Sequence, residues 1–312
     1  EILMSLLYEH KRDKKGNEYI AVTGYEGELP ALIIPDSIED LPVREISASA
    51  FSGRKDIREV ILPDTIEVLG RYAFYNCTNL VKIELSDGVE DYYDGVIKQC
   101  RSLRDIRIDF ERDNYSVMRD MLRDNDRKLR FDLYLKEGIS FSLTFPAYVY
   151  DFVEDVEARV LHHKIEGAGY PYRECVTRKE IDFITYDRLF EHAVSDSIYT
   201  AAEIALDRLM YPYNLNDKRA EDYSSFVLTQ SENILEYLID SQAVKALSRH
   251  SMEIIEYMCK NRLITREAVE KAIKPASDRN MTEVCALLMN YQNENYGMLI
   301  QNTSNELSLE DW

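Results

Sequence analysis

The stretch from Val60 to Leu85, VILPDTIEVLGRYAFYNCTNLVKIEL, decides the fold because its apolar positions recur on both sides of it. The apolar columns repeat every 23 residues, and their members are Val60, Ile83 and Ile106; Leu62, Leu85 and Ile108; Ile57, Leu80 and Leu103; and Phe51, Phe74 and Ile97. Self-similarity at a fixed period of this size is typical of solenoids. We therefore predict a repeat architecture between about Ala31 and Ile108.

Each repeat unit contains a strand-like part and a turn-rich part. In Leu80–Leu85, LVKIEL, apolar and polar residues alternate, which favours a strand with one buried face. Turn residues such as Pro63-Asp64-Thr65 come next, followed by an Ala-Phe pair such as Ala73-Phe74. One coil of this kind cannot bury its apolar side alone. Stacked coils therefore share a core, and their strands form a parallel ladder.

The same alternation predicts an outer face, because every second residue of a strand points away from the core. The outward residues form two columns, Ala31, Glu59, Lys82 and Asp105, and Ile33, Ile61, Glu84 and Arg107. Solenoids commonly bind partners on such a face, and an exposed Ile33–Ile61 pair would suit a partner. Alternatively, an N-terminal hairpin of about Leu3–His10 and Tyr19–Thr23 covers that pair. The candidate binding face is Ile33, Glu59, Ile61, Lys82, Glu84, Asp105 and Arg107.

These units resemble a known family. Residues 33–51, IIPDSIEDLPVREISASAF, and the stretch quoted first are similar to the BspA-like class of bacterial leucine-rich repeats, whose pattern is roughly IP-x-x-V-x-x-IG-x-x-AF-x-x-C-x-x-L-x-x-I. Tyr19–Pro35 resembles the entry segment that often precedes the first repeat of that class. The resemblance spans residues 19–108 and implies a leucine-rich solenoid. Members of the class are often associated with adhesion to host or neighbouring cells.

Two of the units depart from the pattern. The first unit carries a five-residue insertion around Asp40–Val43, because Pro35 and Phe51 lie farther apart than Pro63 and Phe74. The third has Val96-Ile97 where Ala-Phe is expected. Terminal repeats are often atypical because they close the core. We therefore interpret the third unit as the last full coil before a different domain.

The cysteines favour a structural role over a metal or redox site. There are five, none in a Cys-x-x-Cys pair, which makes a zinc ribbon a poor interpretation. Cys77 and Cys100 lie one repeat apart, and neighbouring coils are close enough for a disulfide or a metal pair. A stacked pair of small buried thiols at the usual position of the family is the preferred interpretation. We predict no cofactor and no metal.

The second half of the chain reads differently. NYSVMRDMLRDN predicts a short helix that closes the solenoid, LRFDLYL and ISFSLTF predict a hairpin, and residues 179–292 predict antiparallel helix pairs. The pair around Ala272–Leu288 resembles a degenerate ankyrin helix pair, with generic helical hairpins as the alternative. The predicted fold class is an α/β leucine-rich-repeat solenoid followed by an α-rich, ankyrin-like domain. The predicted parts are an N-terminal strand or hairpin cap at 1–30, the solenoid with its closing helix at 31–127, a strand-containing connector at 128–178, helical pairs at 179–300 and an acidic tail at 301–312.

Composition limits the partners. The net charge is −19, from 57 acidic and 38 basic residues, which disfavours nucleic acid and anionic lipid. No apolar run approaches the length of a membrane helix, so we expect no membrane insertion. Reduced cysteines and the lack of a signal-like leader favour the cytoplasm. A surface or secreted location is the alternative if a leader has been removed.

No catalytic arrangement stands out. The chain has no His-Glu-x-x-His, no Walker A sequence and no Gly-x-Ser-x-Gly elbow. The weak candidates for a pocket are His162, Tyr170, Tyr172 and Arg173, while Gly167-Ala168-Gly169 reads as a turn. The predicted function is a non-catalytic protein-interaction or scaffolding module for an unknown protein or peptide. Its alternatives are an enzymatic or ligand-binding domain in residues 109–292, with the solenoid as its targeting arm, and a bacterial surface adhesin.

Overall fold

The computed structural model describes residues 5–155, 160–239 and 250–297. The chain divides into two compact units, residues 1–196 and 197–312. The first unit contains the strands of the repeat and the segments that close its core, and the second unit is helical. The division after Asp196 lies later in the chain than the start of the predicted helical region at residue 179.

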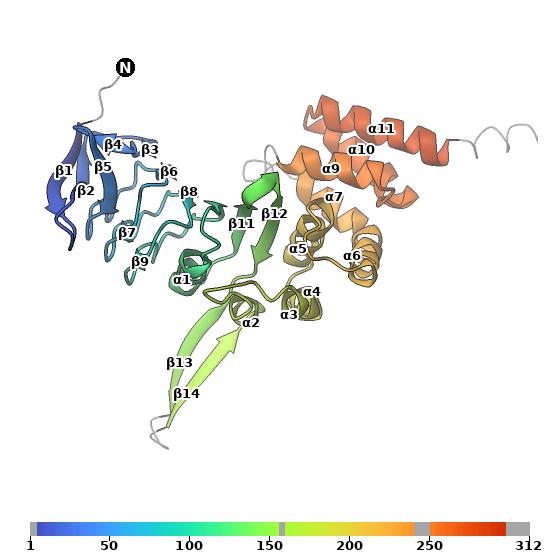
Figure 1. Cartoon of the computed structure of the whole chain (residues 1–312). Helices are drawn as coiled ribbons and strands as arrows, with labels where there is room; N and C mark the ends of the chain where they lie inside the picture. The colour runs from blue at the N-terminus through green and yellow to red at the C-terminus, as the bar shows by residue number, and fades with distance from the viewer. Residues whose placement is uncertain (1–4, 156–159, 240–249, 298–312) are drawn as a thin grey trace, which may run out of the picture. The chain divides into compact units, whose positions relative to one another are not determined.

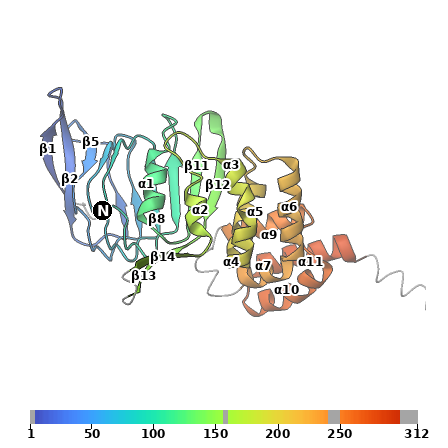
Figure 2. The same ribbon diagram turned by 90° about the horizontal axis from the view of Figure 1, so that it is seen from below.

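The predicted solenoid of parallel strands is confirmed by the first sheet of the first unit. Its strands, in spatial order, are β3 (Ala31–Ile33), β6 (Glu59–Ile61), β8 (Lys82–Ser86), β10 (Asp105–Asp109), β11 (Leu129–Tyr134) and β12 (Ser140–Phe145). Val60 pairs with Ile83, and Ile83 pairs with Ile106, so the sequence columns are rungs of the ladder. Figure 2 shows β8, β11 and β12 following one another along the solenoid.

A second sheet runs along another side of the same coils. It consists of β1 (Ser5–Arg12), β2 (Glu18–Glu26), β5 (Leu41–Ile46), β7 (Val68–Leu69) and β9 (Asp91–Tyr92). The insertion around Asp40–Val43 contains the turn and the start of β5, onto which β4 (Ser37–Ile38) pairs in the antiparallel sense. The backbone reverses at Glu39 and Asp40, whose φ values of 52° and 60° are left-handed.

The N-terminal hairpin belongs to this second sheet. β1 pairs antiparallel with β2, and β2 pairs parallel with β5. The hairpin therefore lies away from β3 and β6. Ile33 remains 53% exposed. The alternative in which the hairpin covers Ile33 and Ile61 is wrong, because the hairpin joins the second sheet, where β2 forms its backbone hydrogen bonds with β5.

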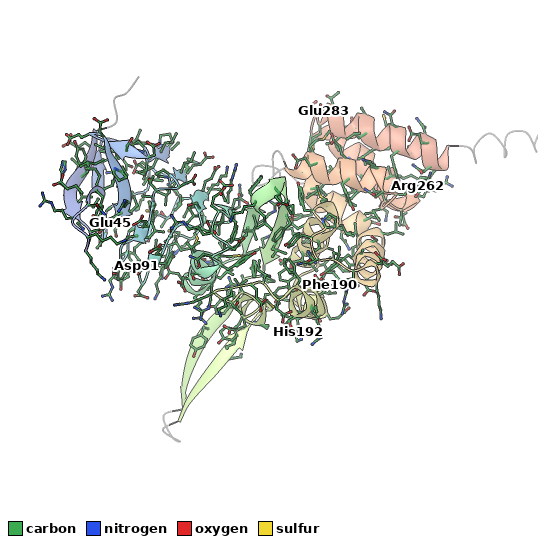
Figure 3. All side chains as sticks on the ribbon, in the orientation of Figure 1. Glu45, Asp91, Phe190, His192, Arg262 and Glu283 are labelled. Carbon is green, nitrogen blue, oxygen red and sulfur yellow. The ribbon has the colours of Figure 1, made fainter. Side chains whose placement is uncertain are left out.

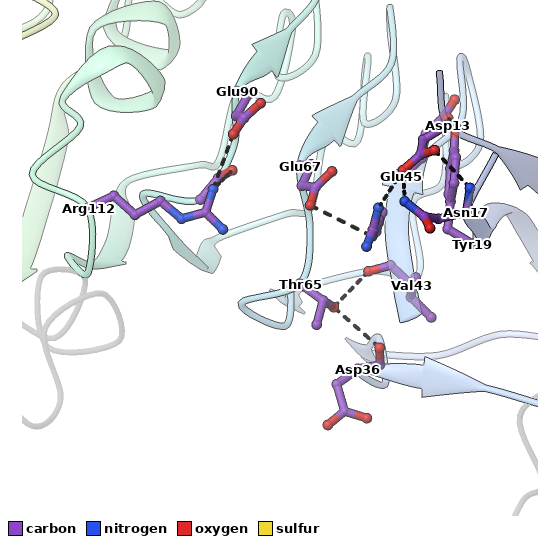
Figure 4. A network of polar contacts seen from close by, with 12 residues as sticks. Asp13, Asn17, Tyr19, Asp36, Val43, Glu45, Thr65, Glu67, Glu90 and Arg112 are labelled. Carbon is purple, nitrogen blue, oxygen red and sulfur yellow. Dashed lines mark hydrogen bonds and ion pairs between the residues drawn. The ribbon is translucent and has the colours of Figure 1, made fainter. Parts of the chain in front are cut away.

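Polar contacts join successive coils along the second sheet (Figure 4). Arg44 lies between Asp13 and Glu67, at N–O distances of 3.5 and 3.7 Å. The Thr65 hydroxyl donates a 2.7 Å hydrogen bond to the Val43 carbonyl of the preceding coil. These side-chain contacts join neighbouring coils in addition to the backbone hydrogen bonds of the sheet.

The ladder does not end with the third unit. β11 pairs parallel with β10, with Ile106 opposite Phe131 and Ile108 opposite Leu133. The step is therefore 25 residues, because helix α1 (Ser116–Asp124) replaces the tight turn of the earlier coils. The interpretation of the third unit as the last full coil is wrong. The hairpin β11–β12 itself forms as its alternating sequence predicts.

One column of polar donors connects each coil to the coil before it. The thiol of Cys77 donates to the Phe51 carbonyl oxygen and that of Cys100 to the Phe74 carbonyl oxygen, each at 3.1 Å. Both are free thiols. In the fourth coil Asn125 Nδ2 donates to the Ile97 carbonyl at 3.3 Å. Asn125 therefore takes the place of the cysteine, since each buried carbonyl of this column needs a donor.

Each coil also turns through two left-handed residues. The first column is Ser49, Tyr72 and Gly95, with φ of 58°, 60° and 74°, and the second is Gly53, Asn76 and Gln99, with φ of 76°, 57° and 65°. A Cβ added to Gly95 would lie 2.3 Å from the Tyr72 ring. Tyr72 of one coil and Gly95 of the next are therefore matched in shape.

Aromatic packing closes the solenoid core beyond β12. The closing helices are α2 (Gly169–Arg173), α3 (Phe183–Arg188) and α4 (Phe190–Asp196). Tyr186 packs edge-on against Phe145 and Tyr172, and its hydroxyl donates a 2.6 Å hydrogen bond to the Thr144 carbonyl. Figure 3 places Phe190 and His192 on α4. These contacts explain why α3 groups with the solenoid, and the first unit extends through α4 to Asp196.

The remaining strands and helices complete the two units. β13 (Val149–Asp155) and β14 (Val160–Glu166) form a separate antiparallel pair. The helices of the second unit are α5 (Ile198–Met210), α6 (Asp217–Thr229), α7 (Ser231–Ile239), α9 (His250–Lys260), α10 (Arg266–Asp278) and α11 (Thr282–Tyr296). The predicted helical region is confirmed. Its likeness to ankyrin pairs stays a prediction.

The entry segment is attached to the first coil by a charged cluster. Asp56 accepts hydrogen bonds from the Leu29 amide at 2.8 Å, from Arg54 at 3.0 Å and from the Tyr25 hydroxyl. Burial opposes ionisation of Asp56, but these donors outweigh it and lower its pKa to about 2. The same site raises the pKa of Tyr25 to about 12, through burial and the hydrogen bond to Asp56.

This cluster predicts a loss of stability in acid. The pKa of Asp56 is about 2 in the folded chain and 3.8 as its ordinary value. The contribution is fully present above pH 4 and is lost as the pH falls through 2, at a cost of about 2 kcal/mol. Urea titrations between pH 5 and 2 measure it. Asp56→Asn removes this pH-dependent term, so an unchanged pH slope in that variant contradicts the prediction.

Candidate functional site

The outer face of the repeat sheet has the two columns that the alternation predicts. Ala31, Glu59, Lys82 and Asp105 are in register across β3, β6, β8 and β10. Ile33, Ile61, Glu84 and Arg107 form the second column. The sheet brings all seven candidate residues onto one face. Whether that face binds a partner stays a prediction.

The middle of the face carries charges that are paired within the chain. Lys82 forms an ion pair with Glu84, and the hydrogen bond that Lys82 donates to Glu84 raises the pKa of Lys82 despite burial. Arg107 lies 3.1 Å from Asp109, and Arg104 lies 2.9 Å from Asp105. Partly exposed pairs of this kind are worth little for stability. They leave the centre of the face polar and nearly neutral.

The β3–β6 end of the face is apolar and open. Ile33 is 53% exposed and lies directly opposite the half-buried Ile61 in the parallel pairing. Neighbouring strands are about 4.8 Å apart, so the two side chains form one continuous apolar surface. Glu59 beside them is exposed. The combination of a rigid backbone, an exposed apolar pair and a polar surround is typical of a partner contact.

The fourth coil extends the face with residues that the period did not indicate. Arg130 and Asp132 are an ion pair at 2.7 Å, and Asp132 accepts a 2.6 Å hydrogen bond from Ser142. Tyr134 is 41% exposed, with the Arg107 guanidinium 4.2 Å from its ring centre. The alternation in LRFDLY marks these residues as outward-facing. Their place on this face was missed because the spacing changes from 23 to 25.

The weak pocket candidates do not form one site among the described side chains. Tyr172 is fully buried against Tyr186, whereas Tyr170 is 39% exposed. His162 lies on β14 opposite Val153, and its side chain is outside the described part. Burial raises the pKa of Tyr172, which is a property of the core rather than of a reactive site.

Arg173 has a structural position. It is 4% exposed, and its guanidinium donates to the carbonyl oxygens of Leu122, Pro146, Gly169, Asn125 and Arg127. Burial lowers its pKa to about 10, so it stays charged at neutral pH. The arginine fastens the end of α1 to β12 and α2. Its five partners lie 4 to 51 residues away along the chain, which explains why sequence inspection could not assign this role.

The helical unit holds a pocket of about 340 Å³, lined by α7 and α10. Lys271 of the lining is already paired, since it lies 2.8 Å from Glu232 and 3.1 Å from Glu267. Among the described residues, no group of three His, Cys, Asp or Glu is placed to hold a metal ion. The described helices also include none that is long and apolar enough to cross a bilayer.

The geometry agrees with the family comparison. Residues 25–119 match the family described as BspA type Leucine rich repeat region (6 copies). The BspA-type match ends inside α1, so β11 and β12 lie beyond it. The resemblance inferred from the repeat is thereby confirmed for this stretch. No curated protein matches the chain.

Solved bacterial leucine-rich repeat proteins align with about a third of the chain. A leucine rich repeat protein of T. pallidum is 30% identical, with 32% of this chain and 50% of that chain covered and a TM-score of 0.30. A leucine rich cell surface protein from Faecalibacterium prausnitzii A2-165 is 24% identical, with 33% and 31% covered and a TM-score of 0.28. One from Bacteroides capillosus ATCC 29799 is 26% identical, with 32% and 77% covered and a TM-score of 0.29. The aligned part thus spans half of the T. pallidum chain.

Proposed function

We propose that this chain is a protein-interaction module that binds a protein partner on the outer face of its repeat sheet. The observation that carries the proposal is the exposed Ile33–Ile61 pair at the β3–β6 end of that face. Burying such a pair favours association by about 25 cal/mol for each Å² of apolar surface removed from water. The paired charges of β8 and β10 form a polar surround that disfavours non-matching partners.

The enzymatic or ligand-binding alternative for residues 109–292 has no specific observation that favours it over the sheet face. The surface adhesin and the cytoplasmic scaffold share the same binding chemistry. Where the protein is located therefore distinguishes these two roles, and the proposed binding face is the same in both.

The face is tested by charge insertion. Ile33→Asp with Ile61→Asp is expected to lower recovery of a specific partner about tenfold or more, because two desolvated carboxylates would be left in the contact. The measurement is affinity capture with the full chain, followed by binding of each recovered protein in purified form. Because both side chains already contact water, the thermal unfolding temperature should stay close to that of the wild type.

The matched control carries the same substitutions elsewhere. Ile184 is 72% exposed and Ile198 is 38% exposed, so Ile184→Asp with Ile198→Asp adds the same charge at other apolar surface sites. The control variant should recover the partner as the wild type does. Equal recovery by all three proteins would remove the outer face from consideration.

A further inference from the structure

A second, chemically different pocket is lined by residues from the end of α1 and the start of β13. Figure 1 labels both elements in the first unit. The volume of the pocket is about 430 Å³. The lining consists of Lys98–Arg101 from the turn of the third coil, Arg123–Arg127 from the end of α1, and Tyr148 and Tyr150. Pockets of this size hold ligands of several chemical groups.

Four cationic residues line this pocket. Lys98, Arg101 and Arg123 are exposed, and within the described part of the chain they have no ion-pair partner. Arg127 reaches only the neighbouring Asp126, at 3.7 Å, with both side chains more than half exposed. Such a concentration of unpaired positive charge is unexpected in a chain whose net charge is −19.

The two acidic residues of the lining, Asp124 and Asp126, offset these cations only in part. The carboxylate of Asp124 accepts three hydrogen bonds from the third coil. The donors are the Ile97 amide at 2.8 Å, the Gly95 amide at 3.1 Å and the Tyr92 hydroxyl at 2.9 Å. The carboxylate holds the turn of the third coil against α1. These donors are neutral and leave the charge of Asp124 in place, so the lining has four cations against two carboxylates and keeps an excess of positive charge.

A fifth positive charge lies directly beneath the pocket. The buried Arg173 donates to the Asn125 carbonyl at 3.2 Å and to the Arg127 carbonyl at 2.7 Å, both on the pocket wall. Its guanidinium also lies 4.7 Å from the centre of the Tyr148 ring. Its hydrogen-bond partners are backbone carbonyls, which do not cancel its charge. The weakly screened interior lets this charge add to the positive potential above it.

We propose that this pocket binds an acidic peptide segment that carries several Asp or Glu side chains. Arginine guanidinium groups pair with carboxylates through two parallel hydrogen bonds, and the two tyrosines offer flat contacts to the peptide backbone. The volume of about 430 Å³ leaves room for more than one carboxylate-bearing side chain. This site is independent of the outer sheet face, so either one can fail without the other.

The experiment uses the full chain and a fluorescein-labelled hexaglutamate peptide, with binding followed by fluorescence anisotropy. We expect saturable binding that weakens as sodium chloride is added. Arg101→Gln with Arg123→Gln should raise the dissociation constant about tenfold or more. A hexaglutamine peptide of the same length should not bind.

The control variant is Lys55→Gln with Arg71→Gln. Both residues are exposed cations outside the lining, and Lys55 occupies the position of Arg101 two repeats earlier. The control should bind hexaglutamate as tightly as the wild type, within about twofold. Circular dichroism of all three proteins establishes that they fold alike.

Three outcomes would overturn the proposal. Equal weakening by the two double variants would show attraction to charge in general rather than binding in the pocket. Unchanged binding by the pocket variant would place the peptide elsewhere. Inorganic phosphate that binds more tightly than hexaglutamate, and loses its binding in the pocket variant, would assign the pocket to a phosphoryl group instead.

Discussion

Replacing Arg173 with methionine is expected to lower the free energy of unfolding by about 4 kcal/mol or more. Methionine fills similar space, but the substitution leaves five carbonyl oxygens without this donor, four of them in buried hydrogen bonds and one, that of Arg127, in a part-buried one. Each unsatisfied buried acceptor costs about 1 to 3 kcal/mol, less whatever water can restore. Urea denaturation of the full chain, followed by circular dichroism, measures the loss.

Arg173→Lys distinguishes geometry from charge. Lysine keeps the positive charge, but its compact ammonium group cannot reach carbonyls from α1, β12 and α2 at once. We expect about half the loss of the methionine variant. If both variants unfold within about 1 kcal/mol of the wild type, Arg173 does not hold these segments together.

Replacing Phe74 with alanine should cost about 4 kcal/mol. Phe74 is 1% exposed and stacks on Phe51 of the preceding coil, with ring centres 5.3 Å apart. Removing the ring leaves a cavity between these two coils. The coils cannot close on it, because backbone hydrogen bonds such as Phe51 N–H to the Ala73 carbonyl, at 2.8 Å, fix their spacing. Urea denaturation again provides the measurement.

Two companion substitutions isolate the packing effect. Phe74→Leu keeps most of the volume, so its cost should be about 1 kcal/mol. Tyr93→Ala removes a ring that is 51% exposed and should change stability by about 0.5 kcal/mol or less. A Phe74→Ala variant no less stable than the Tyr93 variant would contradict stacking as the source of stability in the repeat.

Local sequence predicted the solenoid well because its two signals are periodic. The 23-residue step aligned Val60, Ile83 and Ile106, and the period of two placed Ile33 and Ile61 on the outer face. Each coil buries the same positions with the same types of residue. The same apolar pattern therefore occurs several times in one chain, and each occurrence supports the same prediction.

The prediction was less accurate in the fourth coil, where other residues make the same contacts and the spacing changes. Asn125 supplies the buried donor that Cys77 and Cys100 supply earlier, and α1 lengthens the coil by two residues. LRFDLYL and ISFSLTF indicated a hairpin, which is present. Nothing in their alternation indicated that β11 also pairs with β10, since the partner of a strand depends on contacts far away in the chain.

The order of residues was enough to predict the coil, its buried columns and the seven residues of the candidate face, because burial in a repeat follows a short, regular spacing along the chain. Tertiary structure decided which surfaces remain open. It placed the N-terminal hairpin on the second sheet, which exposes Ile33, and buried Arg173 beneath the basic pocket. Both outcomes depend on hydrogen bonds between segments far apart in the chain, and such bonds leave no periodic trace in the order of residues.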